Sequence, residues 1–154
     1  MTAFPRPEQT GHDFESNVRS IIANAGGRFA HRDHQRHGVH VGLTCYGLPW
    51  YVDAVIENAT AYRHGLIVEC KWQESDGSAD EKFPYLVMNA RRNIRPTIVV
   101  YAGRNARVQG EGMRQEAIDW LKRQVDSEHV LAVLTLEELI PWLRRLTFLK
   151  TQLF

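Results

Sequence analysis

Two apolar stretches joined by a polar turn constrain the fold of this chain more than any other feature. The stretches are YVDAVI and GLIVECKWQ, both rich in the Val and Ile typical of β-strands, and the segment between them has the composition of a turn. Ala61 is the midpoint of that turn and also of the interval from Asp53 to Glu69. An antiparallel hairpin centred on Ala61 would therefore place Asp53 opposite Glu69, with Cβ atoms about 5 Å apart.

The second stretch has one polar and one apolar face. Because strand side chains alternate between faces, Glu69, Lys71 and Gln73 share one of them. Cys70 points with its apolar neighbours into the core. Two carboxylates as close as Asp53 and Glu69 repel each other, and Mg²⁺, which binds one or two carboxylates with waters and phosphate oxygens, would relieve that repulsion. The alternative is a solvated strand face, since an E-x-K triplet alone is common.

The pattern Asp53 … Glu69-x-Lys71 on a hairpin resembles the active site of the PD-(D/E)XK nuclease superfamily. Val52 stands where that family often has proline, a departure that leaves the acidic ligand in place. The resemblance implies that Asp53, Glu69 and the backbone carbonyl of Cys70 bind Mg²⁺, for which Mn²⁺ would substitute. It implies that Lys71 orients or polarises the attacking water.

Two further catalytic candidates come from the same resemblance. In its resolvase-like branches a first-helix glutamate in a G-x-x-F-E arrangement reaches the metal, and Gly11, Phe14 and Glu15 match this arrangement. Glu15 would complete the metal shell or bind a second metal. The alternative is a surface pair with Arg19 at i+4. A polar residue after the motif lysine contacts the metal-bound water or the DNA backbone in such nucleases, which makes Gln73 the second candidate.

Basic residues gather in two segments, although the formal net charge is only +1. Residues 82–110 include five arginines and no acidic residue, and residues 28–40 are rich in arginine and histidine. Such segments contact a phosphate backbone or simply form a solvated surface. The candidate DNA-binding residues are Lys82, Arg32, Arg36, His34, Arg91 and Arg92. The histidines at every third position of the second segment do not predict a zinc site, because the Gly-Gly before them favours strand and loop over helix.

The remaining pattern predicts a mixed α/β fold in one domain, residues 10–154, after an arm of residues 1–9. Thr10 and Asp13 fit a capping box for a first helix that Gly26-Gly27 ends. Further elements are expected over 28–44 (strand, loop and a second strand from Val39), 81–90 (helix), 97–101 (strand), 112–125 (helix), 130–134 (strand) and from Thr135, which Glu138 caps (helix).

This order predicts a central mixed sheet flanked by helices. It matches the restriction-endonuclease-like αβββαβ core that the resemblance implies, with a C-terminal α/β extension. The apolar tail 146–154 would dock on the core or form a subunit interface.

The sequence therefore predicts a Mg²⁺-dependent endonuclease that hydrolyses phosphodiester bonds in DNA and, as resembled enzymes do, leaves a 5′-phosphate. A restriction-type enzyme would cut a fixed duplex sequence, and a resolvase-like enzyme would cut branched DNA by its shape. Either must cut two strands, which predicts a homodimer. The alternatives are a catalytically silent DNA-binding module and a protein-interaction scaffold of the same fold.

The composition predicts a cytoplasmic protein. The two cysteines, Cys45 and Cys70, offer neither a disulfide framework nor zinc-ligand spacing, which fits a reducing compartment. No apolar run approaches the ~20 residues of a membrane span, and the N-terminus lacks the pattern of a signal peptide.

Overall fold

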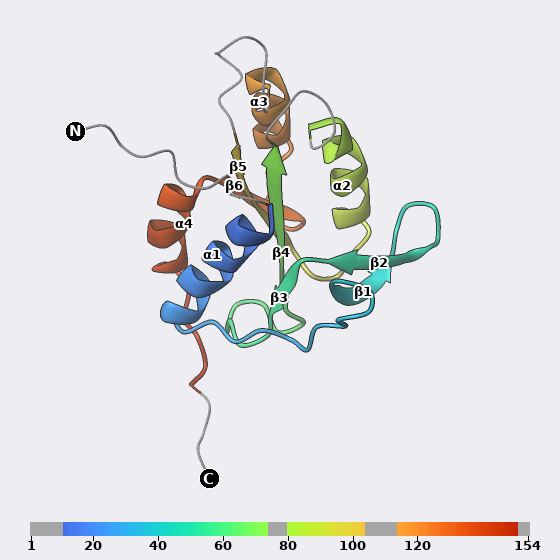
Figure 1. Cartoon of the computed structure of the whole chain (residues 1–154). Helices are drawn as coiled ribbons and strands as arrows, with labels where there is room; N and C mark the ends of the chain where they lie inside the picture. Colours follow the sequence, from blue (N-terminus) through green and yellow to red (C-terminus); the bar gives the residue numbers. More distant parts are fainter. Residues whose placement is uncertain (1–10, 74–79, 104–113, 151–154) are drawn as a thin grey trace, which may run out of the picture.

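A four-stranded mixed sheet forms the centre of the fold (Figure 1). The computed structural model describes residues 11–73, 80–103 and 114–150. The elements are α1 (Gly11–Asn24), β1 (Val39–Leu43), β2 (Pro49–Val52), β3 (Ala54–Ile56), β4 (Leu66–Gln73), η1 (Asp80–Lys82), α2 (Phe83–Ala90), β5 (Thr97–Gly103), α3 (Gln115–Arg123), β6 (Val130–Leu134) and α4 (Leu136–Leu143). The strand order is β3-β4-β5-β6, with β3 antiparallel to β4 and the other three strands parallel. The predicted fold class is confirmed.

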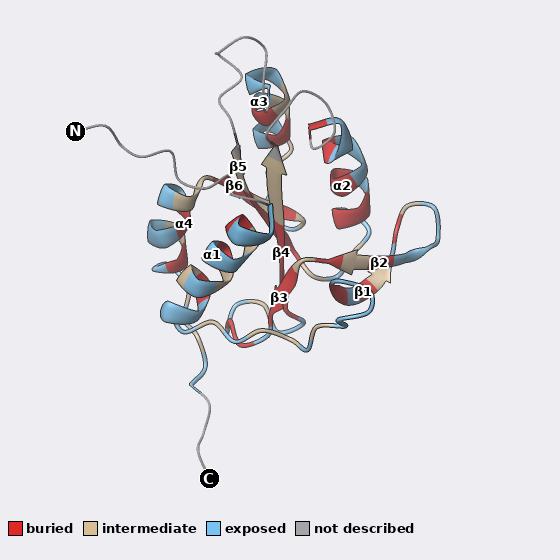
Figure 2. Ribbon diagram, viewed as in Figure 1, coloured by how far each residue is buried: buried red, intermediate tan, exposed pale blue. Residues whose placement is uncertain are grey.

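Helices cover both faces of the sheet, and each face has its own hydrophobic cluster (Figures 1 and 2). Helices α1 and α4 contribute to the cluster on one face, and α2, α3 and the separate antiparallel pair β1–β2 contribute to the cluster on the other. Strand β4 supplies both clusters because its side chains alternate: Val68 is buried with α1 and α4, and Ile67 with α2 and α3. None of the helices within the described ranges has the length and hydropathy that crossing a bilayer requires.

The β3–β4 hairpin has the predicted register. Ala54 pairs with Val68 and Ile56 with Leu66, so the same register places Asp53 opposite Glu69. The expectation that Asp53 lies inside one continuous strand is wrong, because the chain bends there. Strand β2 ends before the bend and pairs with β1, whereas β3 pairs with β4.

Burial on either side of Asp53 explains why β2 and β3 belong to different sheets. In a continuous strand Val52 and Ala54 would face the same side, but they are buried in different clusters, on opposite faces of the sheet. The backbone must therefore turn over at Asp53. The sequence does not reveal this bend, because the segments on either side of Asp53 are equally apolar.

Other elements lie close to their predicted positions. The strand expected from Arg28 is absent from the described residues and is replaced by an isolated bridge between Phe29 and Ile56, although β1 begins at Val39 as predicted. The helix predicted over 81–90 begins with a 3₁₀ turn before α2. Helix α4 has the predicted capping box at Thr135 and continues through Pro141.

The two ends of α1 and the C-terminal segment meet the predictions in part. Gly27 N–H donates to Ile22 O (3.0 Å) and Gly26 N–H to Ala23 O (3.0 Å), which is a Schellman motif at the predicted C-terminus of the helix. The predicted N-terminal cap, Thr10, lies outside the described residues. Phe148 packs against the α1–α4 cluster, so the tail docks on the core as far as the structure describes it.

Gly65, just before β4, should be the glycine that tolerates substitution least in this hairpin. It has φ +104°, and an added Cβ would lie 2.7 Å from Val55 Cγ1. We expect Gly65→Ala to lower the free energy of unfolding by about 3 kcal/mol, combining backbone strain with overpacking. The control is Gly47→Ala, where φ is +78° with open space around the Cβ, and where about 1 kcal/mol is expected. Urea denaturation of both variants measures this, and equal losses would contradict it.

Candidate active site

Asp53 and Glu69 are joined by a reciprocal pair of hydrogen bonds. The backbone N–H of Asp53 donates to Glu69 Oε1 (2.9 Å), and the backbone N–H of Cys70 donates to Asp53 Oδ2 (2.7 Å). Strand β3 is short, so its pairing with β4 ends at Val68. Beyond that point carboxylate oxygens accept from the backbone N–H groups in place of strand carbonyls, and this fixes both acids at the bend.

Lys71 completes the polar face. Its Nζ donates to Glu69 Oε2 at 3.0 Å, so each oxygen of Glu69 accepts one hydrogen bond. The side chain of Glu69 is 8% exposed and that of Lys71 20%, so the pair is mostly buried and part of the lysine side chain is accessible. The three residues that the sequence placed on neighbouring strands are therefore brought together.

Burial and mutual repulsion perturb the titration of this group. Burial, followed by the charge of Glu69, raises the pKa of Asp53 to about 7, against the opposing effects of the Cys70 N–H and Lys71. For Lys71, burial lowers the pKa, but the charges of Glu69 and Asp53 and the hydrogen bond to Glu69 outweigh it, so the net pKa is raised. Lys71 by itself is thus a fixed cation at neutral pH and not a proton acceptor.

The thiol of Cys70 takes no part in this polar face. Its side chain packs against the α1–α4 cluster, as the alternation of β4 predicted. Burial, followed by the charges of Asp53 and Glu69, raises the pKa of Cys70. The thiol is therefore not an activated nucleophile, and only the backbone carbonyl of Cys70 remains as a candidate ligand.

The donor set fits a hard divalent cation. Two carboxylates and a backbone carbonyl, completed by waters and phosphate oxygens, are what Mg²⁺ takes in proteins. Burial and the charge of Glu69 raise the pKa of Asp53, and a cation bound between the two acids would oppose both effects. Within residues 11–73, 80–103 and 114–150 no three His, Cys, Asp or Glu side chains are grouped to hold a metal, so Glu15 does not form such a group with Asp53 and Glu69.

Glu15 reaches the neighbourhood of the site from α1 but is bound by two arginines. Its Oε1 lies 3.4 Å from Arg19 Nε and 3.1 Å from Arg32 Nη1. Its charge also contributes to raising the pKa of Asp53. The pair with Arg19 that the sequence left as an alternative is thus present, and the role of Glu15 as a metal ligand stays a prediction.

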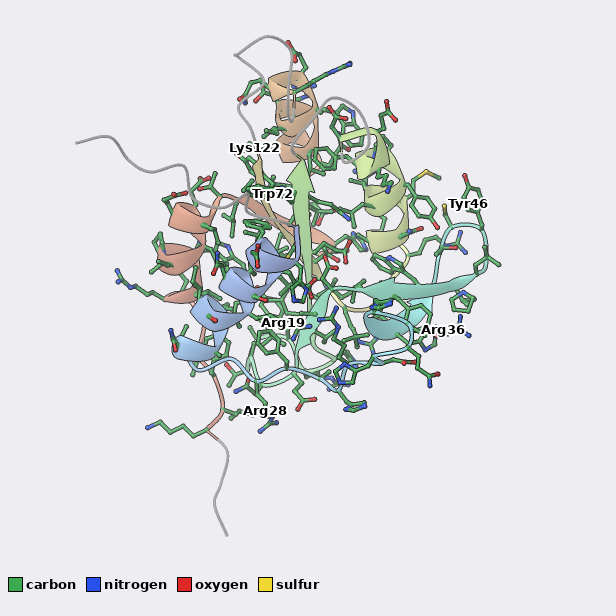
Figure 3. The ribbon with its side chains drawn as sticks, viewed as in Figure 1. Arg19, Arg28, Arg36, Tyr46, Trp72 and Lys122 are labelled. Carbon is green, nitrogen blue, oxygen red and sulfur yellow. The ribbon has the colours of Figure 1, made fainter. Side chains whose placement is uncertain are left out.

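Arg19 is a site residue that the sequence did not indicate. Its Nη2 donates to the backbone oxygen of Asp53 (2.5 Å), and its guanidinium lies 4.8 Å from the ring centre of Phe29. Figure 3 shows it projecting from α1 into the middle of the molecule. The carbonyl of Asp53 lies at the bend between two strands, where Arg19 supplies its donor. The only signal in the sequence was the i+4 spacing of Arg19 from Glu15, which points to that pair and not to Asp53.

The candidate DNA-binding residues stay predictions. Lys82, Arg36, His34, Arg91 and Arg92 are exposed, and Arg32 is half-buried against Glu15. Lys82 and Arg91 flank α2 at its opposite ends, and Arg91 donates to Gln124 Oε1 (2.9 Å). The side chain of Gln73 lies outside the described part of the chain.

Comparison with protein families identifies the chain. Residues 6–147 match the PD-(D/E)XK nuclease superfamily domain. The chain belongs to this superfamily, as the residues around Asp53 and Glu69 indicated. No curated protein and no solved structure matches the chain.

Replacing Asp53 with Asn should stabilise the protein at pH 8 but not at pH 4. The pKa of Asp53 rises from 3.8 to about 7 on folding, so the folded protein retains a proton that the unfolded chain releases in this window. The stability contributed by this group is present below pH 3.8 and is lost as the pH rises through about 7. The amide of the Asp53→Asn variant would not ionise and would still accept from Cys70. We expect the melting temperature of this variant in EDTA to exceed that of wild type by at least about 2 °C at pH 8.

Ca²⁺ provides the complementary test of the same charge. At pH 8 it should raise the melting temperature of wild type and leave Asp53→Asn nearly unchanged, because the variant has lost one of the two carboxylates. Glu57→Gln, at an exposed carboxylate paired with Arg28, is the matched control and should respond like wild type. Parallel pH profiles of wild type and Asp53→Asn would contradict the assigned pKa.

Arg19→Ala should weaken metal binding without removing a metal ligand. Loss of a charged donor to the Asp53 carbonyl is expected to raise the dissociation constant for Ca²⁺ by roughly 10-fold. Arg19→Lys, which can still donate once, should recover part of the affinity. The control Arg28→Ala removes an exposed arginine paired with Glu57 and should leave the affinity unchanged. Titration calorimetry measures all three, and unchanged affinity in Arg19→Ala would show that the bend holds without this contact.

Proposed function

We propose that the protein is a Mg²⁺-dependent endonuclease that hydrolyses phosphodiester bonds in DNA. The observation that supports this best is the convergence of Asp53, Glu69 and Lys71 on one side of the β3–β4 hairpin, with Lys71 Nζ 3.0 Å from Glu69. Membership of a nuclease superfamily supports the same class of reaction.

Each residue of the site has a role in this proposal. Asp53, Glu69 and the carbonyl of Cys70 would hold Mg²⁺, with Glu15 completing the shell or serving a second ion. Bound Mg²⁺ supplies an acidified water and positive charge for the phosphoryl group. Lys71 contributes a permanent positive charge beside the scissile phosphate and orients the water through its remaining N–H donors. The water would lose a proton to solvent and add to phosphorus in line. The leaving O3′ would take up a proton from solvent as the P–O3′ bond breaks, which leaves a 5′-phosphate and a 3′-hydroxyl.

The surrounding basic residues would bind the DNA backbone. We assign Lys82, Arg32, Arg36, His34, Arg91 and Arg92 to phosphate contacts, and Gln73 to the water or the backbone. Five of them are exposed, as phosphate contacts require.

Cleavage of both strands requires two sites, which supports a homodimer. Two free cysteines support a reducing, cytoplasmic location.

Two substrate types fit this chemistry, and one digest separates them. A long linear duplex and a four-way junction are incubated side by side with enzyme and Mg²⁺. Discrete fragments from the duplex would identify a restriction-type enzyme. Selective cutting of the junction would identify a resolvase-like one.

We expect three single variants, Asp53→Ala, Glu69→Ala and Lys71→Ala, each to reduce Mg²⁺-dependent plasmid cleavage by at least about 100-fold. Each variant removes a proposed metal ligand or the charge beside the phosphate. Glu57→Ala is the control: it removes an exposed carboxylate four residues after Asp53 and should cleave like wild type. Circular dichroism verifies the fold of all four variants. Full activity in any of the first three would refute the assignment. Mg²⁺ binding by wild type without cleavage of any DNA would favour a catalytically silent DNA-binding module.

A further inference from the structure

An exposed apolar surface lies where the tip of the β1–β2 hairpin meets α2. We call it the hairpin–α2 patch. Its large side chains are Leu43 (56% exposed), Tyr46 (77%), Leu48 (60%), Tyr85 (37%) and Met88 (55%). Tyr46 stacks on Tyr85, and the other three side chains belong to the same two segments, so exposed apolar groups gather at this junction as they do at interaction sites.

The patch is preformed. The rings of Tyr46 and Tyr85 stack with centroids 5.6 Å apart, and Cys45 N–H donates to Asn89 Oδ1 (2.8 Å). The hairpin tip is closed by a hydrogen bond from Thr44 N–H to the backbone oxygen of Leu48 (2.7 Å). These contacts fix the tip against α2, and Figure 3 shows Tyr46 at the outer edge of the molecule. Because the patch is already ordered, its side chains would lose little conformational entropy when a partner binds.

The composition of the patch indicates the kind of partner. Residues 41–52 and 83–90 contain no acidic or basic side chain, and the charges that flank them along the chain include Asp53, Lys82 and Arg91. A surface that binds duplex DNA must supply cations to the phosphates, and these two segments supply none. Depletion of charge with enrichment of Tyr and Met is typical of the core of a protein–protein interface, with charged residues at the rim.

We infer that the hairpin–α2 patch is the surface through which two copies of this chain form a two-fold dimer. In an isologous interface a patch faces itself, which a charge-free centre allows without like-charge repulsion. A stable dimer buries about 800 Å² on each partner, so the interface must extend beyond these five side chains. Strand β2 runs from the patch directly to Asp53, so the dimer would set the spacing of the two acidic sites. The role of the dimer in spacing the two acidic sites rests on the proposed function, whereas the association itself does not.

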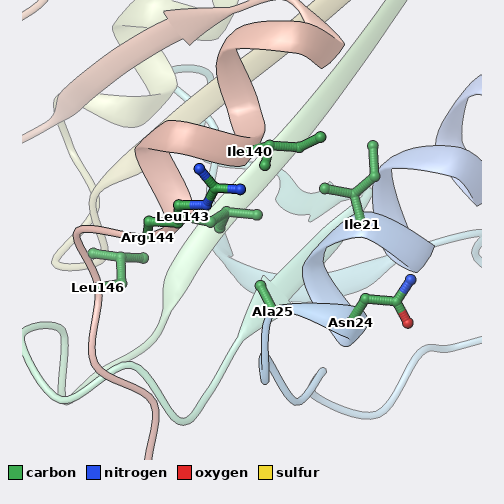
Figure 4. A pocket seen from close by; sticks show the side chains of 7 residues that line it. All are labelled: Ile21, Asn24, Ala25, Ile140, Leu143, Arg144 and Leu146. Atoms are coloured by element: carbon green, nitrogen blue, oxygen red, sulfur yellow. The ribbon is translucent and has the colours of Figure 1, made fainter.

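A second apolar surface provides the matched control. A groove between α1 and α4 is lined by Ile21, Ile140 and Leu146 among others, and it also contains the charged Arg144 (Figure 4). Ile140 is 43% exposed, comparable with the residues of the patch. The groove lies on the opposite face of the sheet from α2.

The test measures association without DNA or metal, by sedimentation velocity over a concentration series. Wild type should dimerise. Tyr46→Glu combined with Leu48→Glu, and the same pair changed to Lys, should each raise the dimer dissociation constant by at least about 30-fold. Ile140→Glu should dimerise like wild type. An equimolar mixture of the Glu and Lys double variants should recover dimers, because opposite charges then face each other. An unfolded variant could not recover dimers in this way. Unfolding is also not expected, because Tyr46 and Leu48 are both exposed.

The inference would be overturned by a monomeric wild type, by dissociation in Ile140→Glu equal to that in the patch variants, or by a mixture that stays monomeric. Patch variants that keep the mass of wild type but lose DNA affinity would also overturn it, in favour of a direct DNA contact. The inactive Asp53→Ala should still dimerise, so failure of the chemistry and failure of the interface are separate outcomes.

Discussion

The reciprocal hydrogen bonding between Asp53 and the edge of β4 is the interaction on which the rest of this structure depends. A carboxylate oxygen on each side accepts from the backbone of the other, in the place where a strand carbonyl would normally stand. The chain can leave the sheet at Asp53 because both backbone groups of this residue are hydrogen-bonded. Its N–H donates to Glu69, and its carbonyl accepts from Arg19. A buried bend without these partners would leave backbone groups unsatisfied, at a cost of about 1–3 kcal/mol for each.

The same contacts create an electrostatic conflict that the protein does not resolve by itself. They hold two acids together under partial burial. Burial, followed by the charge of Glu69, raises the pKa of Asp53, and the opposing effect of Lys71 is smaller. The two hydrophobic clusters behind the bend keep the acids from separating. In the proposed function a bound cation would relieve this repulsion, and the fold would present the two acids to it already in place.

The proposed chemistry and the proposed assembly lie on different parts of the molecule. The acids and Lys71 lie at the edge of β4, whereas the apolar hairpin tip and α2 form a separate surface without charge at its centre. Strand β2 joins the two, since one of its ends is the tip and the other is the bend at Asp53. This short connection would link the geometry of the proposed interface to the position of the proposed metal ligand Asp53.

The sequence by itself determined the strand register, the alternation of β4 and most element boundaries. These depend on local rules: a turn fixes the midpoint of a hairpin, side chains alternate with period two, and Thr135 with Glu138 caps a helix. Only the tertiary structure decided that the strand breaks at Asp53, that Arg19 binds its carbonyl 34 residues away, and that Tyr46 stacks on Tyr85. Such contacts join segments whose approach is set by the packing of the whole core, and no local pattern encodes that packing.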